Sequence, residues 1–383
     1  MKTITRLVCL ALTFALAAMM LASCGGGAAY TANNTEYFIG GTGPLTGDAS
    51  SYGISANNGA MLAIEELNAN GGLNGVKFHY EMKDDTAAAE PAATGFNALY
   101  EAGMQISIGS VTSASCASFG DLAVENNVLF MTPSASDAKV IAKGDVAFRV
   151  CFGDPQQGTI AADTLTVKYA KIGVIYDTSD TYSSGLYDAF EAEMTVLGKA
   201  KDTDYVVRTF DAESNKDFST QVSALQEAGC DVMFLPMYYT EAGLIAKAAA
   251  SKGFNVPILG SDGLDGVAGQ IAGSNVTASI EYISPFDVNS KDETIAAFVA
   301  AYEAKYGVKP DQFAADGYDA VMILFAAMQK AGVNDVTMSA SDMTNLVKPV
   351  LTSADFSYTG ITGKMTWTPD GSCNKDPIMV KVN

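Results

Sequence analysis

Hydrophobic and polar positions between residues 36 and 260 follow two alternating periods. Short apolar runs of the kind that form strands are separated by longer stretches in which apolar residues recur at helical spacing. The clearest strand is predicted at residues 76–82, where Val, Phe, Tyr and Met alternate with Lys, His and Glu. His79 falls on the polar face of that strand. We interpret it as a solvent-facing side chain, because no Ser or Cys partner for a catalytic base can be placed beside it.

The pattern predicts a regular succession of strands and helices. The first helix carries an apolar stripe of Ile54, Met61, Ile64 and Leu67. The elements expected after residue 82 are helices at 88–102, 115–126, 155–169, 183–197, 218–228 and 241–252, and strands at 105–109, 128–131, 172–176, 204–210, 231–235 and 256–260. Such alternation with short connections is typical of α/β proteins with parallel sheets covered by helices on both faces. Two series, divided near residues 149–153, predict two lobes.

The first two dozen residues have the pattern of an export signal. Lys2 and Arg6 precede an uncharged stretch at residues 7–21, and small residues lead into Cys24. This apolar stretch is shorter than the roughly twenty residues that a membrane-spanning helix needs. Its end resembles the lipobox of bacterial lipoproteins, which implies that residues 1–23 are a signal peptide and that Cys24 is lipidated. The alternative is an ordinary signal with a free thiol. Residues 24–35 then form a flexible linker.

Composition narrows the possible functions. The formal net charge of −20 opposes binding to nucleic acid. His79 is the only histidine in the chain, so a zinc site lacks ligands, and we expect no metal and no cofactor. Beyond Cys24, the chain has Cys116, Cys151, Cys230 and Cys373, none in a CxxC motif. They allow two disulfides in three connectivities, but we interpret them mainly as small buried apolar residues.

Polar side chains follow the predicted strands at corresponding positions in both halves. In the first half, Ser113 follows the strand at 105–109, and Ser134, Ala135 and Ser136 follow the next strand. In the second half, Tyr238 and Asp262 occupy the corresponding places. The carboxyl edge of parallel strands is where open α/β sheets bind ligands.

The chemistry of these residues fits the two ends of an α-amino acid. Ser113 and the 134–136 loop precede helices whose first N–H groups lack internal partners, so they can hold a carboxylate. Asp262 supplies a negative charge and Tyr238 a phenolic oxygen and an aromatic face, which suit an ammonium group. Each residue alone could also be an ordinary helix cap or, for Tyr238, a core residue. The prediction depends on their convergence.

Several motifs taken in order resemble one protein family. They are IGGTGPLTG at 39–47 with Tyr52-Gly53, the helix from Gly59 through Asn68 into Gly71-Gly72, Asp84-Asp85, GSVTSAS at 109–115, TPSAS at 132–136, Asp217-Phe218, GITG at 360–363 and Asp370-Gly371. This series is similar to the type I periplasmic binding proteins of the branched-chain amino acid group, which serve ABC importers. The resemblance runs from about residue 37 to the end of the chain.

The resemblance implies two doubly wound lobes joined by a three-strand hinge, with lobe 1 at 36–151 and 284–358 and lobe 2 at 152–283 and 359–383. By position, the family's carboxylate contacts match Ser113, Ser136 and the backbone at Ser134 and Ala135, and its ammonium contacts match Tyr238 and Asp262. Tyr52 matches an aromatic residue that lines the ligand side chain, and Tyr182 matches a residue that closes over the ligand. Family members often have Glu at the position of Asp262. A first-lobe disulfide of well-known members lacks its cysteine near residues 86–87.

Three classes of function compete. The first is a monomeric, lipid-anchored, extracytoplasmic receptor that hands an amino acid to ABC permease subunits. The second is a sensor of amino acids, amides or aromatic acids that signals to a partner protein. The third is an enzyme, for which the sequence shows no nucleophile–base pair, metal cluster or phosphate loop. We predict the transport receptor, with an aliphatic or branched-chain amino acid as the ligand.

Overall fold

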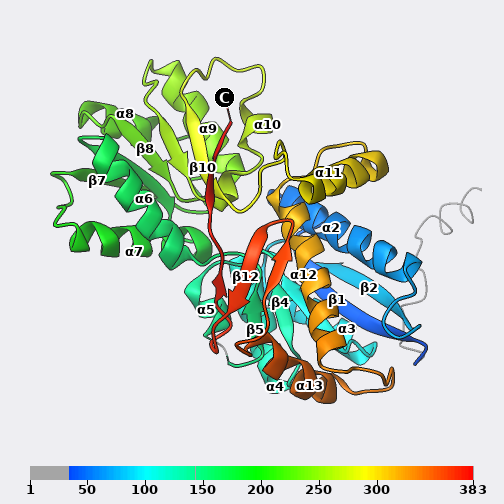
Figure 1. The fold of residues 1–383 in the computed structure, drawn as a ribbon. Helices are drawn as coiled ribbons and strands as arrows, with labels where there is room; N and C mark the ends of the chain where they lie inside the picture. The colour runs from blue at the N-terminus through cyan, green and yellow to red at the C-terminus, as the bar shows by residue number, and fades with distance from the viewer. Residues whose placement is uncertain (1–33, 143, 383) are drawn as a thin grey trace, which may run out of the picture.

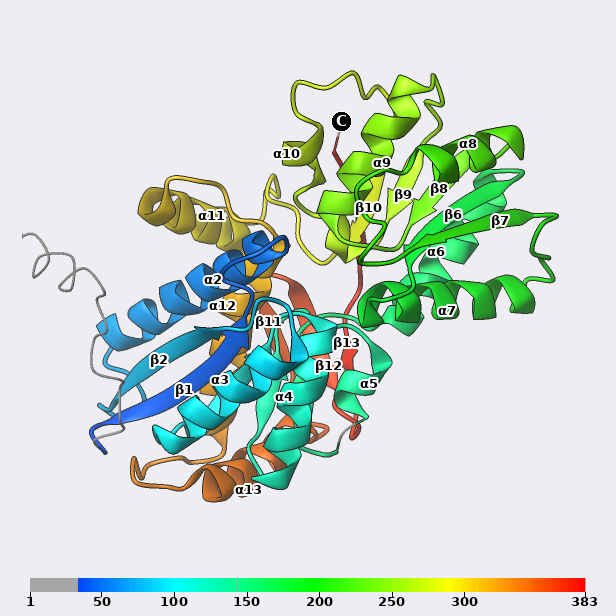
Figure 2. The ribbon, with the colours of Figure 1, turned by 180° about the vertical axis from the view of Figure 1, so that it is seen from behind.

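Two α/β lobes lie end to end and are joined by a narrow waist (Figure 1). The computed structural model describes residues 34–142 and 144–382. The predicted signal peptide, Cys24 and almost all of the predicted linker lie outside this part of the chain. Figure 2 shows the same division from behind, with helices on both faces of each large sheet. The predicted fold class is confirmed.

The first lobe is built on a five-stranded parallel sheet with the order β2-β1-β3-β4-β5. Its strands are β1 (Glu36–Gly43), β2 (Lys77–Asp84), β3 (Ile106–Ser110), β4 (Phe130–Thr132) and β5 (Ala147–Arg149). Its helices are α2 (Ser50–Ala69), α3 (Ala89–Glu101), α4 (Ser113–Glu125), α5 (Ala138–Ile141), α11 (Glu293–Tyr306), α12 (Gln312–Lys330) and α13 (Ala340–Leu351). Strands β1 and β3 are buried along almost their whole length, because helices cover both faces of the sheet.

The second lobe contains a six-stranded sheet with the order β14-β10-β9-β8-β6-β7. Its strands are β6 (Ile172–Asp177), β7 (Tyr205–Phe210), β8 (Val232–Leu235), β9 (Ile258–Gly260), β10 (Ile280–Ser284) and β14 (Ile378–Lys381). Its helices are α6 (Asp154–Lys168), α7 (Thr181–Val196), α8 (Ser219–Glu227), α9 (Tyr239–Ser251), the short 3-10 helix η1 (Asp262–Leu264) and α10 (Val267–Ile271). Only the last strand, β14, runs antiparallel to its neighbour.

The chain crosses between the lobes at residues 150–153, 285–292 and 375–377. Before the third crossing, β11 (Tyr358–Gly360), β12 (Gly363–Trp367) and β13 (Cys373–Asn374) form a small antiparallel sheet. This sheet packs against the first lobe, where Trp367 Nε1 donates to the carbonyl oxygen of Arg149 at 2.8 Å. The third crossing was expected near residue 359, but residues 358–374 still belong to the first lobe, and the chain enters lobe 2 only after residue 374.

Helix α2 packs through a face that only partly matches the predicted one, since Ile64 and Leu67 of the expected apolar stripe are each only 6% exposed. Ile54 and Met61 of the expected apolar stripe are 44% and 39% exposed. The buried face is instead made largely of small residues that allow helix α12 to approach closely. A Cβ atom on Gly59 would lie 1.9 Å from the carbonyl oxygen of Ala314. Hydrophobic periodicity missed this face because Ala and Gly give little apolar signal.

Two further sequence interpretations can be compared with the structure. Cys116, Cys151, Cys230 and Cys373 are all buried and unpaired, in agreement with their interpretation as core residues. His79 is half-buried on the edge strand β2, with its ring centre 4.9 Å from that of Phe38. The predicted solvent-facing position of His79 was therefore only partly correct, because the edge strand is itself partly covered.

Candidate functional site

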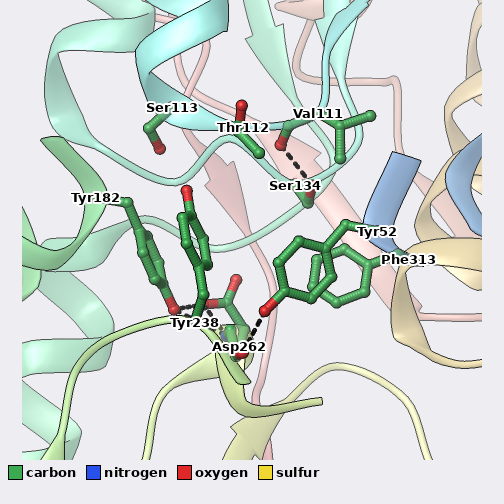
Figure 3. A pocket seen from close by; sticks show the side chains of 10 residues that line it. Tyr52, Val111, Thr112, Ser113, Ser134, Tyr182, Tyr238, Asp262 and Phe313 are labelled. Carbon is green, nitrogen blue, oxygen red and sulfur yellow. Dashed lines mark hydrogen bonds between the residues drawn. The ribbon is translucent and has the colours of Figure 1, made fainter. Parts of the chain in front are cut away.

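A cavity lies between the lobes, at the carboxyl ends of the strands that face the waist (Figure 3). Its lining residues are Tyr52, Val111, Thr112, Ser113, Ser134, Tyr182, Tyr238, Asp262, Gly263 and Phe313. Most of these residues follow a strand or begin a helix. Parallel strands end at one edge of each sheet, so both lobes direct their strand-end loops toward the same space. Six of the eight residues predicted to bind ligand therefore meet here.

The first lobe supplies hydroxyl groups and a helix N-terminus. Thr112 precedes α4, but its side chain does not cap the helix, and its buried hydroxyl has no hydrogen-bond partner within the described structure. Ser113 is 1% exposed, and its Oγ accepts from the backbone N–H of Asp137 at 3.2 Å. The Oγ of Ser134 donates to the carbonyl oxygen of Val111 at 2.7 Å. This side of the cavity is polar, and the positive end of the α4 dipole favours an anion there.

The second lobe supplies a buried carboxylate. Asp262 Oδ1 accepts from Tyr182 Oη at 2.6 Å and from Gln157 Nε2 at 3.1 Å. The backbone N–H of Asp262 in turn donates to Gln157 Oε1 at 3.0 Å. Desolvation raises the pKa of the Asp262 carboxyl group to about 6, although the hydrogen bonds from Tyr182 and Gln157 favour its charged form. A cationic group beside Asp262 would bring that pKa back down.

Aromatic side chains form the rest of the wall and connect the two lobes. Tyr52 comes from α2, and its hydroxyl donates to the carbonyl oxygen of Gly263 at 2.5 Å while accepting from the N–H of Tyr239 at 3.1 Å. The Tyr52 ring centre lies 4.2 Å from that of Phe313. On the opposite wall, the rings of Tyr182 and Tyr238 stack at 4.9 Å. The lobes are thus already in contact across the cavity.

These contacts leave a cavity of about 10 Å³, roughly the space for one water molecule. An amino acid is much larger. Its entry therefore requires the lobes, or the aromatic side chains between them, to move apart. Because the crossing segments are the only covalent links between the lobes within the described residues, a hinge motion about them is the simplest way to open the cavity.

Ala135 and Ser136, the other two predicted ligand residues, do not line this cavity. Ala135 is fully buried in the core of the first lobe. The carbonyl oxygen of Ser136 accepts from the N–H of Asp154 at 3.0 Å, which ties this loop to the start of α6. The hydroxyl of Ser136 is buried and has no hydrogen-bond partner within the described structure.

Sequence reasoning missed Asp154, which begins α6 immediately after the first crossing. The residue is 1% exposed, and neither of its carboxylate oxygens has a hydrogen-bond partner within the described structure. Desolvation raises the pKa of Asp154 well above its ordinary value, and the nearby charge of Asp262 adds to this effect. Asp154 also lies in the wall of a cavity of about 370 Å³ between α5 and helices α6 and α7. Two buried carboxylates thus approach the space between the lobes.

The fold and the site define a two-lobed receptor that binds a small solute between α/β lobes. A family model described as "Periplasmic binding protein" matches residues 36–383. The chain belongs to this family, in the type I group that includes the branched-chain amino acid receptors of ABC importers. The family consists of solute-binding proteins rather than enzymes, and it implies a location outside the cytoplasm.

Curated relatives and solved structures agree with this assignment. The Leu/Ile/Val-binding protein homolog 3 of Brucella melitensis is 29% identical over 82% of this chain and 84% of its own length. The Leu/Ile/Val-binding protein homolog 1 of Brucella suis is 31% identical over 76% of this chain and 78% of its own length. A leucine-binding protein, LivK, from Thermotoga maritima superposes with a TM-score of 0.78 at 26% identity, covering 90% of this chain and 94% of its own.

No helix in residues 34–142 and 144–382 is both long and apolar enough to cross a bilayer. In the same part of the chain, no three His, Cys, Asp or Glu side chains come together in a way that could hold a metal ion.

Proposed function

We propose that this protein is the receptor of an ABC importer for an aliphatic α-amino acid, which it binds between its lobes. The observation that carries the proposal is the polarity of the cavity. Hydroxyl groups and a helix N-terminus come from the first lobe, and a buried carboxylate comes from the second. A zwitterion matches this arrangement, because its two charged groups need opposite environments within a few bonds of each other.

The carboxylate end of the ligand fits beside Thr112 and Ser113. The unpartnered Thr112 hydroxyl supplies a donor that the protein itself does not use. The first N–H groups of α4 have no side-chain cap from Thr112, so they too are available to an anion. Together these groups would replace the water that the ligand carboxylate loses on burial.

The ammonium end fits beside the carboxylate of Asp262, with Asp154 buried close enough to feel its charge. Burial raises the pKa values of both groups, so a cation beside Asp262 would relieve an electrostatic cost. The unpartnered Ser136 hydroxyl belongs to the loop whose carbonyl oxygen accepts from the N–H of Asp154. We therefore assign Ser136 to the ammonium side of the site. The family resemblance alone had implied that Ser136 contacts the carboxylate of the ligand.

The side chain of the ligand fits against Tyr52, Val111 and Phe313. The hydroxyl of Tyr52 already makes two hydrogen bonds to the second lobe, so it offers no free polar group to a ligand. Phe313 and Val111 present only carbon to the cavity. An apolar side chain is favoured here because a polar one would lose its hydrogen bonds to water without replacement. The Brucella relatives, which are named for leucine, isoleucine and valine, support the same ligand class.

Closure of the lobes would couple binding to transport. Tyr52 and Tyr239 contribute to hydrogen bonds that cross between the lobes, so a ligand held by both lobes stabilises a shape that permease subunits can recognise. We further propose that the chain is monomeric and is held at the outer face of the membrane by a lipid on Cys24. A lipid-anchored receptor stays close to its permease after each release of ligand.

A ligand panel tests the proposal. The chain beginning at residue 25 is unfolded by heat with leucine, isoleucine, valine, alanine, glutamine, urea and benzoate in turn, and positive ligands are measured by calorimetry. At a free concentration of 100 times Kd, a ligand raises the free energy of unfolding by about 2.7 kcal/mol. We expect the largest shift with an aliphatic amino acid. A shift with benzoate alone, or with no compound, would contradict the amino acid assignment.

A further inference from the structure

A buried ion cluster occupies the third crossing between the lobes. The side chain of Lys375 is 0% exposed, and its Nζ lies 3.3 Å from Oδ1 of Asp316, whose side chain is 2% exposed. The same Nζ donates to Oγ1 of Thr362 at 2.5 Å. The Thr362 hydroxyl in turn donates a hydrogen bond to Oδ2 of Asp319 at 2.6 Å. Lys375 therefore fixes the crossing segment to helix α12 of the first lobe.

Burial of these charged groups costs desolvation free energy, so their place at a crossing between the lobes indicates a role there. Asp319 is fully buried and also accepts from the backbone N–H groups of Ile361 and Thr362. Desolvation raises the pKa of Asp316 to about 7, while the ammonium of Lys375 opposes that shift. A purely apolar contact could pack this region at lower electrostatic cost. Paired buried charges do, however, impose a defined geometry on the segments that carry them.

The backbone of Lys375 is tied to the second lobe. Its carbonyl oxygen accepts from Nε2 of Gln156 at 3.1 Å, in the first turn of α6. The next residue, Gln157, makes the two hydrogen bonds that hold the carboxylate and the N–H of Asp262. One residue thus connects the third crossing to the helix that orients the binding carboxylate.

Helix α12 provides a second connection between Lys375 and Asp262. Gln312 lies one turn before Asp316 on this helix, so both side chains are on the same face. The side-chain amide of Gln312 donates to the carbonyl oxygen of Asp262, and its Oε1 accepts from Ser284 Oγ at 3.0 Å. Ser284 is the last residue of β10, where the second crossing begins. Two chains of contacts therefore connect Lys375 to Asp262, one through α6 and one through α12.

We propose that Lys375 is a positioning residue for ligand binding, which sets the angle between the lobes and thereby the place of Asp262 in the closed site. Lys375 is not among the residues that line the cavity. Its ammonium group acts through Asp316 on α12, and its carbonyl oxygen acts through Gln156 on α6. This role rests on the proposed function only for the identity of the ligand.

The test separates positioning from stability. Lys375→Met alone leaves Asp316 buried without its partner and is expected to lower the melting temperature strongly. The double variant Lys375→Met/Asp316→Asn removes both charges and is expected to recover most of that loss. We expect its Kd for leucine to be about tenfold above that of the wild type. We also expect its ligand-free radius of gyration, from small-angle X-ray scattering, to differ from that of the wild type.

An exposed ion pair that includes the last residue of α12 provides the control. Lys330 contacts Asp355 at 3.0 Å near the end of α12, and both side chains are partly or largely exposed. Lys330→Met/Asp355→Asn should leave the Kd and the radius of gyration at wild-type values. If Lys375→Met/Asp316→Asn also shows the wild-type Kd and scattering, the cluster only stabilises the fold and the proposal is wrong. If the wild type binds none of the aliphatic amino acids of the panel, the proposed function fails, and the ligand-free scattering still decides the role of Lys375.

Discussion

Removing the charge of Asp262 should weaken an amino acid much more than a ligand without an ammonium group. Asp262→Asn preserves the size of the side chain and keeps an oxygen that can accept from Tyr182 and Gln157. It removes the negative charge beside the ligand ammonium. A buried charged hydrogen-bond pair that loses one partner costs about 2–5 kcal/mol. Since 1.4 kcal/mol corresponds to about tenfold in Kd, the Kd for leucine should rise by roughly 30-fold or more.

The pH dependence gives a second, independent measurement on the same variant. Burial raises the pKa of the Asp262 carboxyl group to about 6. A bound ammonium lowers this pKa, so binding below pH 6 must first release a proton. The affinity of the wild type should therefore be highest above pH 6 and should fall as the pH drops through that value. The fall near pH 6 should be absent from Asp262→Asn, whose remaining pH dependence reflects Asp154 with a pKa lowered by the loss of the Asp262 charge.

Calorimetry with two ligands of the same shape provides the assay. Leucine and 4-methylpentanoate share the carboxylate and the branched side chain, but only leucine carries the ammonium. Asp163→Asn, on the exposed face of α6, is a control for the loss of a carboxylate from the same lobe. Equal losses of affinity for the two ligands in Asp262→Asn, or an unchanged slope with pH, would refute the assignment of this carboxylate to the ammonium.

Two further substitutions test the closure of the lobes and the packing beneath the site. Tyr52→Phe removes the hydroxyl that forms hydrogen bonds to Gly263 and Tyr239 across the lobes. The loss of about 1 kcal/mol should raise the Kd for leucine about fivefold. An unchanged Kd in calorimetry would show that these hydrogen bonds do not favour closure. Gly59→Ala places a methyl group 1.9 Å from the carbonyl oxygen of Ala314 and should lower the free energy of unfolding by about 3 kcal/mol in urea. Gly269→Ala, which meets no atom within 4 Å, is its control.

The alternation of strands and helices could be predicted from the sequence because both sheets are parallel. Each strand is an apolar run, and each helix returns the chain to the same edge, so local periodicity reports the topology. The helices expected at 88–102 and 155–169 correspond to α3 and α6 with ends displaced by one residue. The part of α2 that packs against α12 could not be found in this way. Close contact between helices there depends on the absence of side-chain volume at Gly59, and hydrophobicity does not measure that.

The candidate site was predictable only where each residue ends a strand or begins a helix. Ser113, Tyr238 and Asp262 satisfy that rule and line the cavity. Phe313 begins α12, in a part of the chain for which the pattern gave no element. Asp154 begins a helix beside a proline, where an acidic residue is common for reasons of capping alone. Its burial without a partner depends on how the lobes meet, and that is a property of the tertiary structure.

The distribution of charge explains why opening and closing can be reversible. Asp154 and Asp262 are buried in the contact between the lobes, and burial raises both pKa values, so the closed form without a cation carries an electrostatic penalty. The hydrogen bonds of Tyr52 and its ring contacts with Tyr238 and Tyr239 of the second lobe act in the opposite direction. A ligand ammonium removes the penalty and leaves the favourable contacts in place. The ligand therefore binds the closed form more tightly than the open form, and this difference in binding free energy shifts the population toward the closed form.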